Sequence, residues 1–426
     1  MARVISETGL GSFPNKRFQL KASNGAIVLE VKPLVNPERV SWRLPPSKSH
    51  MIRWIAMAAQ SKNETELHFS GIPGDDIFSM ADCMEKMGMK IEKGRGKWVV
   101  KRGLNGNLSG ETVLDCGNSA TTARVVTSIA AGIGSIFHID GDYSLRRRDA
   151  THLNNALREL GCNISDDSIP FSISGPILPR NATVDQSESS QTLTGLILAS
   201  PRFPNGASIF LKGRAVSRGY RDLTIDICRV CGWEGGIDSG VVDIGGWTVR
   251  TPEVVEIPEE ISLLPISLLY DRLHDTKSMK IEIVNSDSRI LEAINSITGC
   301  NGGVVDLRDA SDLISPAAAI IALGEGGKIV ESSHAKGKET DRIDSTFKML
   351  SSFGISTEKS EDGLIVPGGQ WPTSPSKPVN SHYDHRLAMT AIVLASLVGA
   401  RIYGEESCSV THPDFIEMIL GETGGK

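Results

Sequence analysis

One unit recurs six times along the 426-residue chain: an amphipathic helix that ends in glycine and is followed by a short strand. Glycine suits the left-handed conformation just past a helix end. The glycines lie 55 to 73 residues apart, too far for a solenoid of small repeats, so the spacing predicts six copies of a mixed β/α unit. Six units fit two similar domains of three. The six positions are Gly88, Gly161, Gly232, Gly299, Gly354 and Gly421.

A second series of six helices begins with hydroxyl-bearing and cationic residues. Ser, Thr and Asp are common N-caps, but capping does not explain the Lys, Arg, Gln and His residues beside them. Helix N-termini present free N–H groups and the positive end of the helix dipole. If the six starts converge, they predict a site for a small ligand with several negative charges and hydroxyls. The starts lie at Pro45–Ser49, Gly117–Thr122, Ser187–Gln191, Ser217–Arg221, Lys336–Arg342 and Asp384–Arg386.

The most highly charged of these starts is Lys336–Arg342, between a strand pattern and a helix that Gly354 ends. One interpretation is a solvated helix start with Thr340 as its N-cap. The other is an anion-binding turn in which Glu339 lies among cations. The five other starts favour the second interpretation.

Composition excludes several classes of function. A net charge of −6 and a pI near 5.9 argue against nucleic-acid binding. The longest apolar runs, such as Leu196–Ala199, are far shorter than the roughly 20 residues of a membrane span. Seven cysteines without secretory spacing predict reduced thiols and a cytoplasmic location. The first 25 residues lack the amphipathic or apolar core of a targeting segment, so we expect an ordinary extension.

Three local patterns suggest other chemistry but are incomplete. Gly324–Lys328 resembles a phosphate loop, yet Ile329 stands where Ser or Thr is required and a strand pattern follows. The CxxC of Cys228 and Cys231 has no second ligand pair. The histidines around Asp384 lack further metal ligands. A metallohydrolase is therefore a remote alternative, and the sequence implies no metal.

Taken together, these residues resemble the 5-enolpyruvylshikimate-3-phosphate (EPSP) synthase family, enolpyruvyl transferases of the shikimate pathway, from Pro45 to the C-terminus. The resemblance implies an α/β fold of two similar domains, each of three βαβαββ units, with helix N-termini facing an interdomain cleft. Residues 1–46 and 255–426 would form a discontinuous domain that includes the extension 1–25. Residues 47–254 would form an inserted domain that binds shikimate 3-phosphate. The motifs that carry the resemblance are Pro45–Ser49, Gly117–Thr121, Ser189–Gln191, Lys338–Arg342 and Asp384–Arg386.

The same resemblance implies roles for individual residues. Asp312 and Glu339 would transfer protons, supported by Lys48 and His385. Shikimate 3-phosphate would contact Ser49, Arg53, Ser189, Ser190, Gln191, Ser217, Tyr220 and Lys338. Phosphoenolpyruvate would contact Lys48, Asn118, Ala120, Arg148, Gln191, Arg342 and Arg386. The resemblance implies no cofactor or metal, two small-molecule substrates, no nucleic-acid or membrane partner, and a monomer.

Three positions depart from the family pattern. Val410 stands where a phosphoenolpyruvate-binding lysine is common, and His334 where asparagine is expected. Ala120 stands where members sensitive to the inhibitor glyphosate carry glycine. None of these departures removes the predicted proton-transfer pair.

The implied reaction moves the enolpyruvyl group of phosphoenolpyruvate to the 5-hydroxyl of shikimate 3-phosphate and releases phosphate. One alternative is UDP-N-acetylglucosamine enolpyruvyl transferase, which shares the fold but lacks the Lys338–Arg342 and Asp384–Arg386 motifs and typically uses a loop cysteine. Another is a non-catalytic binder of phosphorylated metabolites, which would not need Glu339 among the cations.

Overall fold

The computed structural model describes residues 18–23, 26–104, 111–203, 205–278 and 288–421. Most of the expected extension, residues 1–17 and 24–25, lies outside this description. Residues 18–23 form a strand, β1 (Phe18–Ser23), which pairs antiparallel with β2 (Ala26–Val31). That part of the expected extension therefore belongs to a sheet.

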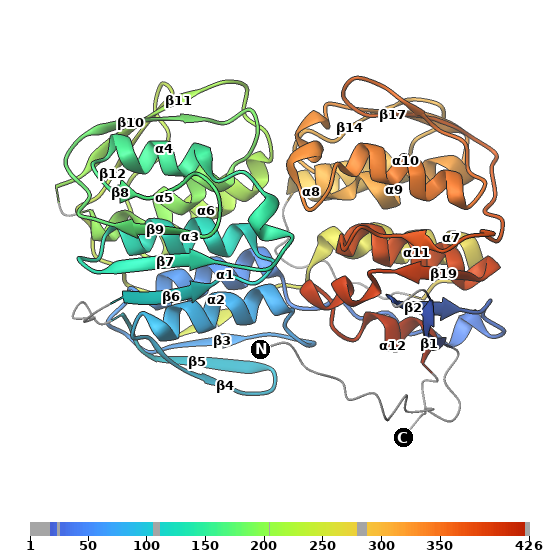
Figure 1. The fold of residues 1–426 in the computed structure, drawn as a ribbon, viewed down its shortest axis with the longest axis horizontal. Coiled ribbons are helices and arrows are strands. Elements are labelled where there is room, and N and C mark those ends of the chain that lie inside the picture. Colours follow the sequence, from blue (N-terminus) through green and yellow to red (C-terminus); the bar gives the residue numbers. More distant parts are fainter. Residues whose placement is uncertain (1–17, 24–25, 105–110, 204, 279–287, 422–426) are drawn as a thin grey trace.

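The chain folds into two lobes (Figure 1). The inserted lobe has a hydrophobic core drawn from residues 51–257. The terminal lobe has a separate core drawn from residues 29–44 and 261–420. The chain crosses between the lobes twice, and Pro46 and Glu259 pair at the crossing as an isolated antiparallel bridge.

One sheet of the inserted lobe displays the repeating unit in full. Its strand order is β6-β7-β9-β8, in which β6 and β7 are parallel and the other neighbours are antiparallel. This is a βαβαββ unit, as the family resemblance implies. Its elements in chain order are β6 (Glu111–Asp115), α3 (Ala120–Ala131), β7 (Ile136–Asp140), α4 (Thr151–Glu159), β8 (Asn163–Ile164) and β9 (Phe171–Ser174).

The terminal lobe contains a second complete unit with the same pairing, in the order β14-β15-β17-β16. Its elements are β14 (Val304–Asp306), α9 (Ile314–Leu323), β15 (Gly326–Val330), α10 (Arg342–Ser352), β16 (Glu358–Lys359) and β17 (Leu364–Pro367). The predicted strand and helix on either side of Lys336–Arg342 are thus confirmed, with a short 3-10 helix, Ser333–Gly337, between them.

Two further sheets are completed by strands that are distant in sequence. In the inserted lobe, the parallel partner of β3 is β13, which comes from the returning crossover. The elements of this unit are α1 (Lys48–Ala58), β3 (Thr65–His68), α2 (Asp75–Lys86), β4 (Lys90–Lys93), β5 (Lys97–Arg102) and β13 (Val254–Glu256). In the terminal lobe, the N-terminal hairpin of β1 and β2 supplies the last two strands (Figure 1). The other elements there are β18 (Val379–Asn380), α11 (His385–Val398), β19 (Ala400–Tyr403) and α12 (Phe415–Leu420).

The fifth sheet has three described strands, in the order β10-β11-β12. Its elements are β10 (Asn181–Asp185), α5 (Gln191–Ala199), β11 (Ala207–Lys212), α6 (Arg218–Val230) and β12 (Val241–Ile244). The sixth predicted unit would include residues 279–287, which lie outside the described residues. Its two helices are α7 (Leu264–His274) and α8 (Ser288–Thr298).

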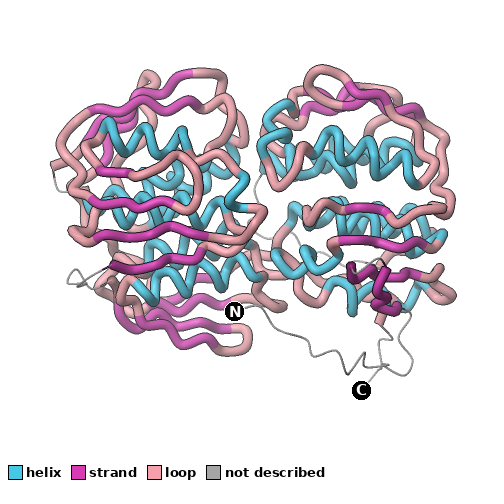
Figure 2. The backbone as a smooth tube through the Cα atoms, in the orientation of Figure 1, coloured by secondary structure: helices cyan, strands magenta, loops and turns pink. Residues whose placement is uncertain are grey.

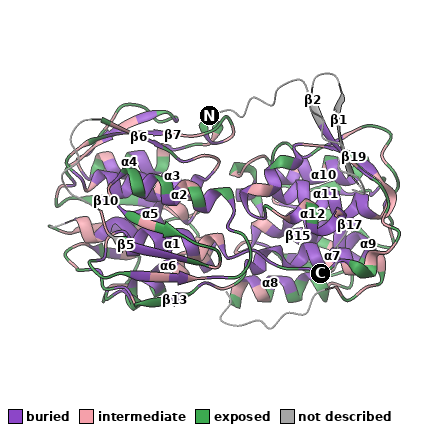
Figure 3. Ribbon diagram, turned by 90° about the horizontal axis from the view of Figure 1, so that it is seen from below, coloured by how far each residue is buried: buried purple, intermediate pink, exposed green. Residues whose placement is uncertain are grey.

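Helices occupy the middle of each lobe and the sheets lie toward the outside (Figure 2). Two helices are almost completely buried: every residue of α9 and all but two residues of α11 (Figure 3). Within the described part of the chain, no helix is both long and apolar enough to cross a membrane.

The prediction that glycine ends the repeated helices in a left-handed conformation holds at four of six positions, with φ between +75° and +102°. It is wrong at Gly299 and Gly421. Their N–H groups donate to Asn295 and Glu417, four residues earlier, so the chain continues the helical hydrogen-bond pattern there. The four left-handed positions are Gly88, Gly161, Gly232 and Gly354.

Candidate active site

Six helices point their N-termini at one cavity of about 1300 Å³ between the lobes. Residues at the starts of α1, α3, α5 and α6 line it from the inserted lobe, and residues at the starts of α10 and α11 line it from the terminal lobe. The convergence inferred from the sequence is therefore present. Six positive helix ends around one cavity favour an anionic ligand.

Every residue that the sequence analysis assigned to the site lines this cavity; the individual roles remain predictions. They are Lys48, Ser49, Arg53, Asn118, Ala120, Arg148, Ser189, Ser190, Gln191, Ser217, Tyr220, Asp312, Lys338, Glu339, Arg342, His385 and Arg386.

The N-cap of α10 is Asp341, which corrects the alternative that gave this role to Thr340. The Asp341 carboxylate accepts hydrogen bonds from the N–H groups of Ile343 and Asp344, each at 3.1 Å. The Thr340 hydroxyl instead contacts the Ser345 hydroxyl at 2.5 Å. A charged cap complements the positive helix end better than a hydroxyl does.

Arg342 is the centre of the charged cluster and is only 1% exposed. Its Nη1 donates to Asp312 Oδ1 and its Nη2 to Glu339 Oε2, both at 2.5 Å, while Nε donates to Asp384 Oδ2 at 2.7 Å. Asp384 also caps α11 by accepting from the N–H of Arg386 at 2.9 Å. One guanidinium therefore holds together the two predicted proton-transfer groups and the start of α11.

Both predicted proton-transfer carboxyls are ionised in this cluster. Burial raises the pKa of Asp312, but Lys338 at 3.6 Å and Arg342 outweigh it and hold the pKa well below its ordinary value. Burial likewise raises the pKa of Glu339, and Arg342 and Arg148 bring it well below the ordinary value. An anion that pairs with these cations would raise the pKa of Glu339 and favour its protonated form.

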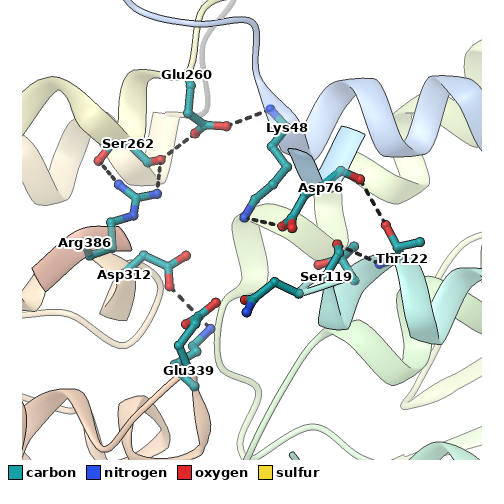
Figure 4. Close-up of polar contacts among 12 residues, drawn as sticks. Lys48, Asp76, Ser119, Thr122, Glu260, Ser262, Asp312, Glu339 and Arg386 are labelled. Carbon is teal, nitrogen blue, oxygen red and sulfur yellow. Dashed lines mark hydrogen bonds and ion pairs between the residues drawn. The ribbon is translucent and has the colours of Figure 1, made fainter. Parts of the chain in front are cut away.

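Lys48 reaches the cavity from the start of α1 and pairs with Asp76, Nζ to Oδ2 at 2.9 Å (Figure 4). Asp76 is 4% exposed, and burial raises its pKa against the opposing charge of Lys48. No motif indicated Asp76. The available signal was an acidic residue in the first turn of α2, which is common wherever a helix begins.

Arg386 differs from Arg342 in its surroundings. Its Nη1 donates to the Ser262 carbonyl at 2.5 Å and its Nη2 to the Ser262 hydroxyl at 2.6 Å. No carboxylate lies within ion-pair distance of it among the residues that the structure describes. A buried cation held only by neutral oxygens is poised for an anionic ligand. Beside it, burial and the nearby Lys48 hold the pKa of His385 well below its ordinary value, so this imidazole is neutral.

On the inserted-lobe side, Arg53 acts partly as a structural tie between α1 and α6. Its Nη1 donates to the Ser49 carbonyl at 2.8 Å, its Nη2 to the Tyr220 carbonyl at 2.9 Å and its Nε to the Thr224 hydroxyl at 2.8 Å. The Tyr220 hydroxyl reaches across the cavity and donates to Asp312 Oδ2 at 3.1 Å. These contacts fix the spacing of two helix starts around the cavity.

The departures from the family pattern also line the cavity. Burial lowers the pKa of His334 to about 4, so its imidazole is neutral. Val410 lies where the lobes touch through their backbones: a Cβ atom on Gly74 would lie 2.4 Å from the Val410 carbonyl oxygen. Glycine at position 74 is therefore required by this approach rather than by its φ of −75°.

Glu405 gives a prediction about stability and pH. It is 5% exposed, its Oε2 has no hydrogen-bond partner among the described residues, and burial raises its pKa to about 7. Since the folded state then binds more protons than the unfolded state between about pH 4.5 and 7, unfolding free energy falls as pH rises through this window. Between pH 5 and pH 8, the free energy of unfolding of the wild type should fall by about 2 kcal/mol more than that of Glu405→Gln. Urea unfolding measures both values. The exposed Glu358→Gln is the control, and parallel pH profiles for all three proteins would contradict the prediction.

The fold of this chain is that of solved enolpyruvyl transferases. The fold is similar to the enolpyruvyl transferase NikO from Streptomyces tendae, with a TM-score of 0.69, 12% identity and coverage of 92% of this chain and 97% of that one. It is also similar to an EPSP synthase from Acinetobacter baumannii, with a TM-score of 0.72, 20% identity and coverage of 91% and 96%.

Within that class, the chain belongs to the EPSP synthase (3-phosphoshikimate 1-carboxyvinyltransferase) family, whose model matches residues 38–235 and 268–419. A 3-phosphoshikimate 1-carboxyvinyltransferase from Methanococcoides burtonii is 30% identical over 407 residues, covering 88% of this chain and 93% of the relative. One from Halobacterium salinarum is 27% identical over 431 residues, covering 93% and 98%. The predicted family and α/β fold class are confirmed.

Proposed function

We propose that this chain transfers the enolpyruvyl group of phosphoenolpyruvate to the 5-hydroxyl of shikimate 3-phosphate and releases phosphate. Family membership supports the reaction, and the observation that carries it is the contact of Arg342 with both Asp312 and Glu339 at a cavity lined by six helix starts. A protein that only bound phosphorylated metabolites would not need two carboxylates against the cations that attract its ligand.

We further propose that the lobes are two domains, with residues 47–254 inserted between residues 1–46 and 255–426. The inserted domain binds shikimate 3-phosphate and the cations around Glu339 bind phosphoenolpyruvate. The protein acts as a cytoplasmic monomer. The separate hydrophobic cores and the paired crossing at Pro46 and Glu259 support this division.

In the proposed addition step, Glu339 donates a proton to the methylene carbon of phosphoenolpyruvate. The 5-hydroxyl oxygen bonds to the adjacent carbon, and its proton passes to Asp312. In the elimination step a methyl proton returns to Glu339, the carbon–oxygen bond to phosphate breaks, and the departing phosphate takes the proton from Asp312. Both carboxyls thus end in their starting states, as a catalytic pair requires.

The order of events follows from electrostatics. Without ligand, the cations keep Glu339 ionised and unable to donate. When phosphate and carboxylate groups bind to Arg148, Arg342 and Lys48, they neutralise those charges and raise the pKa of Glu339. Substrate binding therefore favours the uptake of a proton from solvent by Glu339, which can then act as the proton donor.

An assay with the purified protein tests the function directly. Phosphate release from phosphoenolpyruvate should require shikimate 3-phosphate and should not occur with UDP-N-acetylglucosamine. The motifs around Lys338–Arg342 and Asp384–Arg386 favour the first acceptor. Release driven by the UDP-sugar would assign the chain to the other acceptor, and release with neither would overturn the proposal.

Ala120 gives a prediction about glyphosate, which is longer than phosphoenolpyruvate. Ala120 is the first residue of α3, lines the cavity and is 9% exposed. Its methyl group should crowd the longer inhibitor, and overpacking costs about 1 to 3 kcal/mol. The variant Ala120→Gly should therefore bind glyphosate roughly tenfold to a hundredfold more tightly, as measured by inhibition against phosphoenolpyruvate.

The control for this substitution is Ala123→Gly, a buried position one turn further along α3 that tests for general loosening of the helix. Inhibition of the wild type at low micromolar glyphosate, or equal inhibition of wild type and Ala120→Gly, would contradict the steric argument.

A further inference from the structure

The crossing between the lobes holds a buried carboxylate, Glu260, to which the reaction above gives no role. Glu260 is 5% exposed and lines the cavity. Its backbone N–H donates to the Pro45 carbonyl at 2.9 Å, which ties the outgoing and returning chain segments together. A carboxylate is buried at such cost only when several donors satisfy it.

Two of these donors belong to the start of α1. The Lys48 N–H donates to Glu260 Oε2 at 2.9 Å (Figure 4). The Ser47 hydroxyl donates to the same oxygen at 3.2 Å. The carboxylate thus occupies the positive end of α1. It fixes the backbone from which Lys48 extends toward the cavity.

The other oxygen of Glu260 accepts a hydrogen bond from the terminal lobe. Ser262 Oγ donates to Glu260 Oε1 at 2.5 Å, which directs the lone pairs of that hydroxyl away from Glu260. Arg386 Nη2 donates to this hydroxyl, while Nη1 donates to the Ser262 carbonyl. The orientation of the Arg386 guanidinium therefore depends on Glu260 through one serine.

The contrast with Arg342 explains why the carboxylate acts through an intermediary. Arg342 contacts three carboxylates directly, so much of its charge is already balanced. A carboxylate in direct contact with Arg386 would compete with an anionic substrate for the same donors. Because Glu260 contacts Arg386 only through Ser262, it orients the guanidinium and leaves the Arg386 charge available for a substrate anion.

We propose that Glu260 is a positioning residue that orients Lys48 of the inserted lobe and Arg386 of the terminal lobe for the phosphate and carboxylate groups of phosphoenolpyruvate. This inference rests on the proposed function. It assigns to the crossing, in addition to its connecting role, control over the relative placement of two cations that come from different lobes.

The test compares Glu260→Gln with Ser262→Ala and with the control Glu259→Gln, which removes a neighbouring exposed carboxylate that does not line the cavity. In Glu260→Gln, an amide N–H₂ that faces the start of α1 opposes the Lys48 N–H, and one that faces Ser262 forces this hydroxyl to accept where it now donates. The KM for phosphoenolpyruvate should rise roughly tenfold to a hundredfold. The KM for shikimate 3-phosphate should change much less, and Glu259→Gln should match the wild type.

The variant Ser262→Ala should raise the KM for phosphoenolpyruvate as well, because it removes the hydroxyl that links Glu260 to Arg386. The double variant should show less than the product of the two single effects. A merely structural role would raise both KM values together and give multiplicative effects, and either result would overturn the inference.

Calorimetric titration with phosphoenolpyruvate separates this inference from the proposed function, because binding needs no turnover. Weaker binding to Glu260→Gln than to wild type supports the inference even if the wild type fails to release phosphate, which would overturn only the function. Equal affinity of the two proteins would overturn the inference even in a fully active enzyme.

Discussion

Replacing Arg342 with methionine is expected to lower the free energy of unfolding by about 3 to 5 kcal/mol, because it leaves buried carboxylates without their shared cation. Asp384 is fully buried, and Asp312 and Glu339 lose their shortest ion pairs at the same time. Chemical denaturation at pH 7 measures the loss. The control is Arg214→Met, which breaks an exposed pair with Glu331 and should cost about 0 to 1 kcal/mol.

The sign of the pH dependence provides an independent check of this prediction. Asp312 and Glu339 have folded-state pKa values below their ordinary values, so their pairing stabilises the protein above pH 4.5. That contribution disappears as pH falls through the folded-state pKa values. The difference between wild type and Arg342→Met should therefore narrow in acid. A constant difference, or a loss below about 1 kcal/mol at pH 7, would show that the cluster does not stabilise the fold in this way.

Replacing Glu339 with glutamine is expected to lower kcat by roughly a hundredfold to ten-thousandfold, because the variant cannot donate a proton to the methylene carbon. The side chain keeps its size and its capacity to accept from Arg342, so the KM for phosphoenolpyruvate should change little. Steady-state kinetics at saturating shikimate 3-phosphate measures both values.

The matched control is Asp344→Asn, which removes a carboxylate from the first turn of α10, the helix that follows Glu339, but away from the cavity. Asp344 pairs with Lys348 and Lys359, and its loss should leave kcat unchanged. Near-normal turnover in Glu339→Gln would remove this residue from the proposed chemistry.

The sequence was most informative where a local signal and its structural consequence coincide. Hydroxyls and cations at helix starts are local features, and the six starts do converge on the cavity. Glycine was a less reliable guide because only some helix ends require a left-handed residue: Gly354 adopts that conformation and Gly299 does not. The choice of Asp341 over Thr340 as the cap depends on side-chain geometry that spacing alone does not determine.

Long-range pairing accounts for most of what the sequence did not show. The hairpin of β1 and β2 completes a sheet with β19, and β13 completes a sheet with β3, although each pair is far apart in the chain. Asp76 and Glu260 lie outside the recognised motifs and enter the site through similar distant contacts. No periodicity indicates such partners, because it reports only which face of an element is buried.

The paired crossing at Pro46 and Glu259 has a consequence for how such a chain can be rearranged. Both ends of the inserted lobe leave the terminal lobe at one point, where the Ser47 N–H donates to the Pro258 carbonyl at 2.8 Å. A segment whose two ends meet can be exchanged, duplicated or circularly permuted with little disturbance to its host. The inserted lobe is therefore a unit that can be exchanged as a whole. Recombination at these two adjacent positions would join lobes from different relatives.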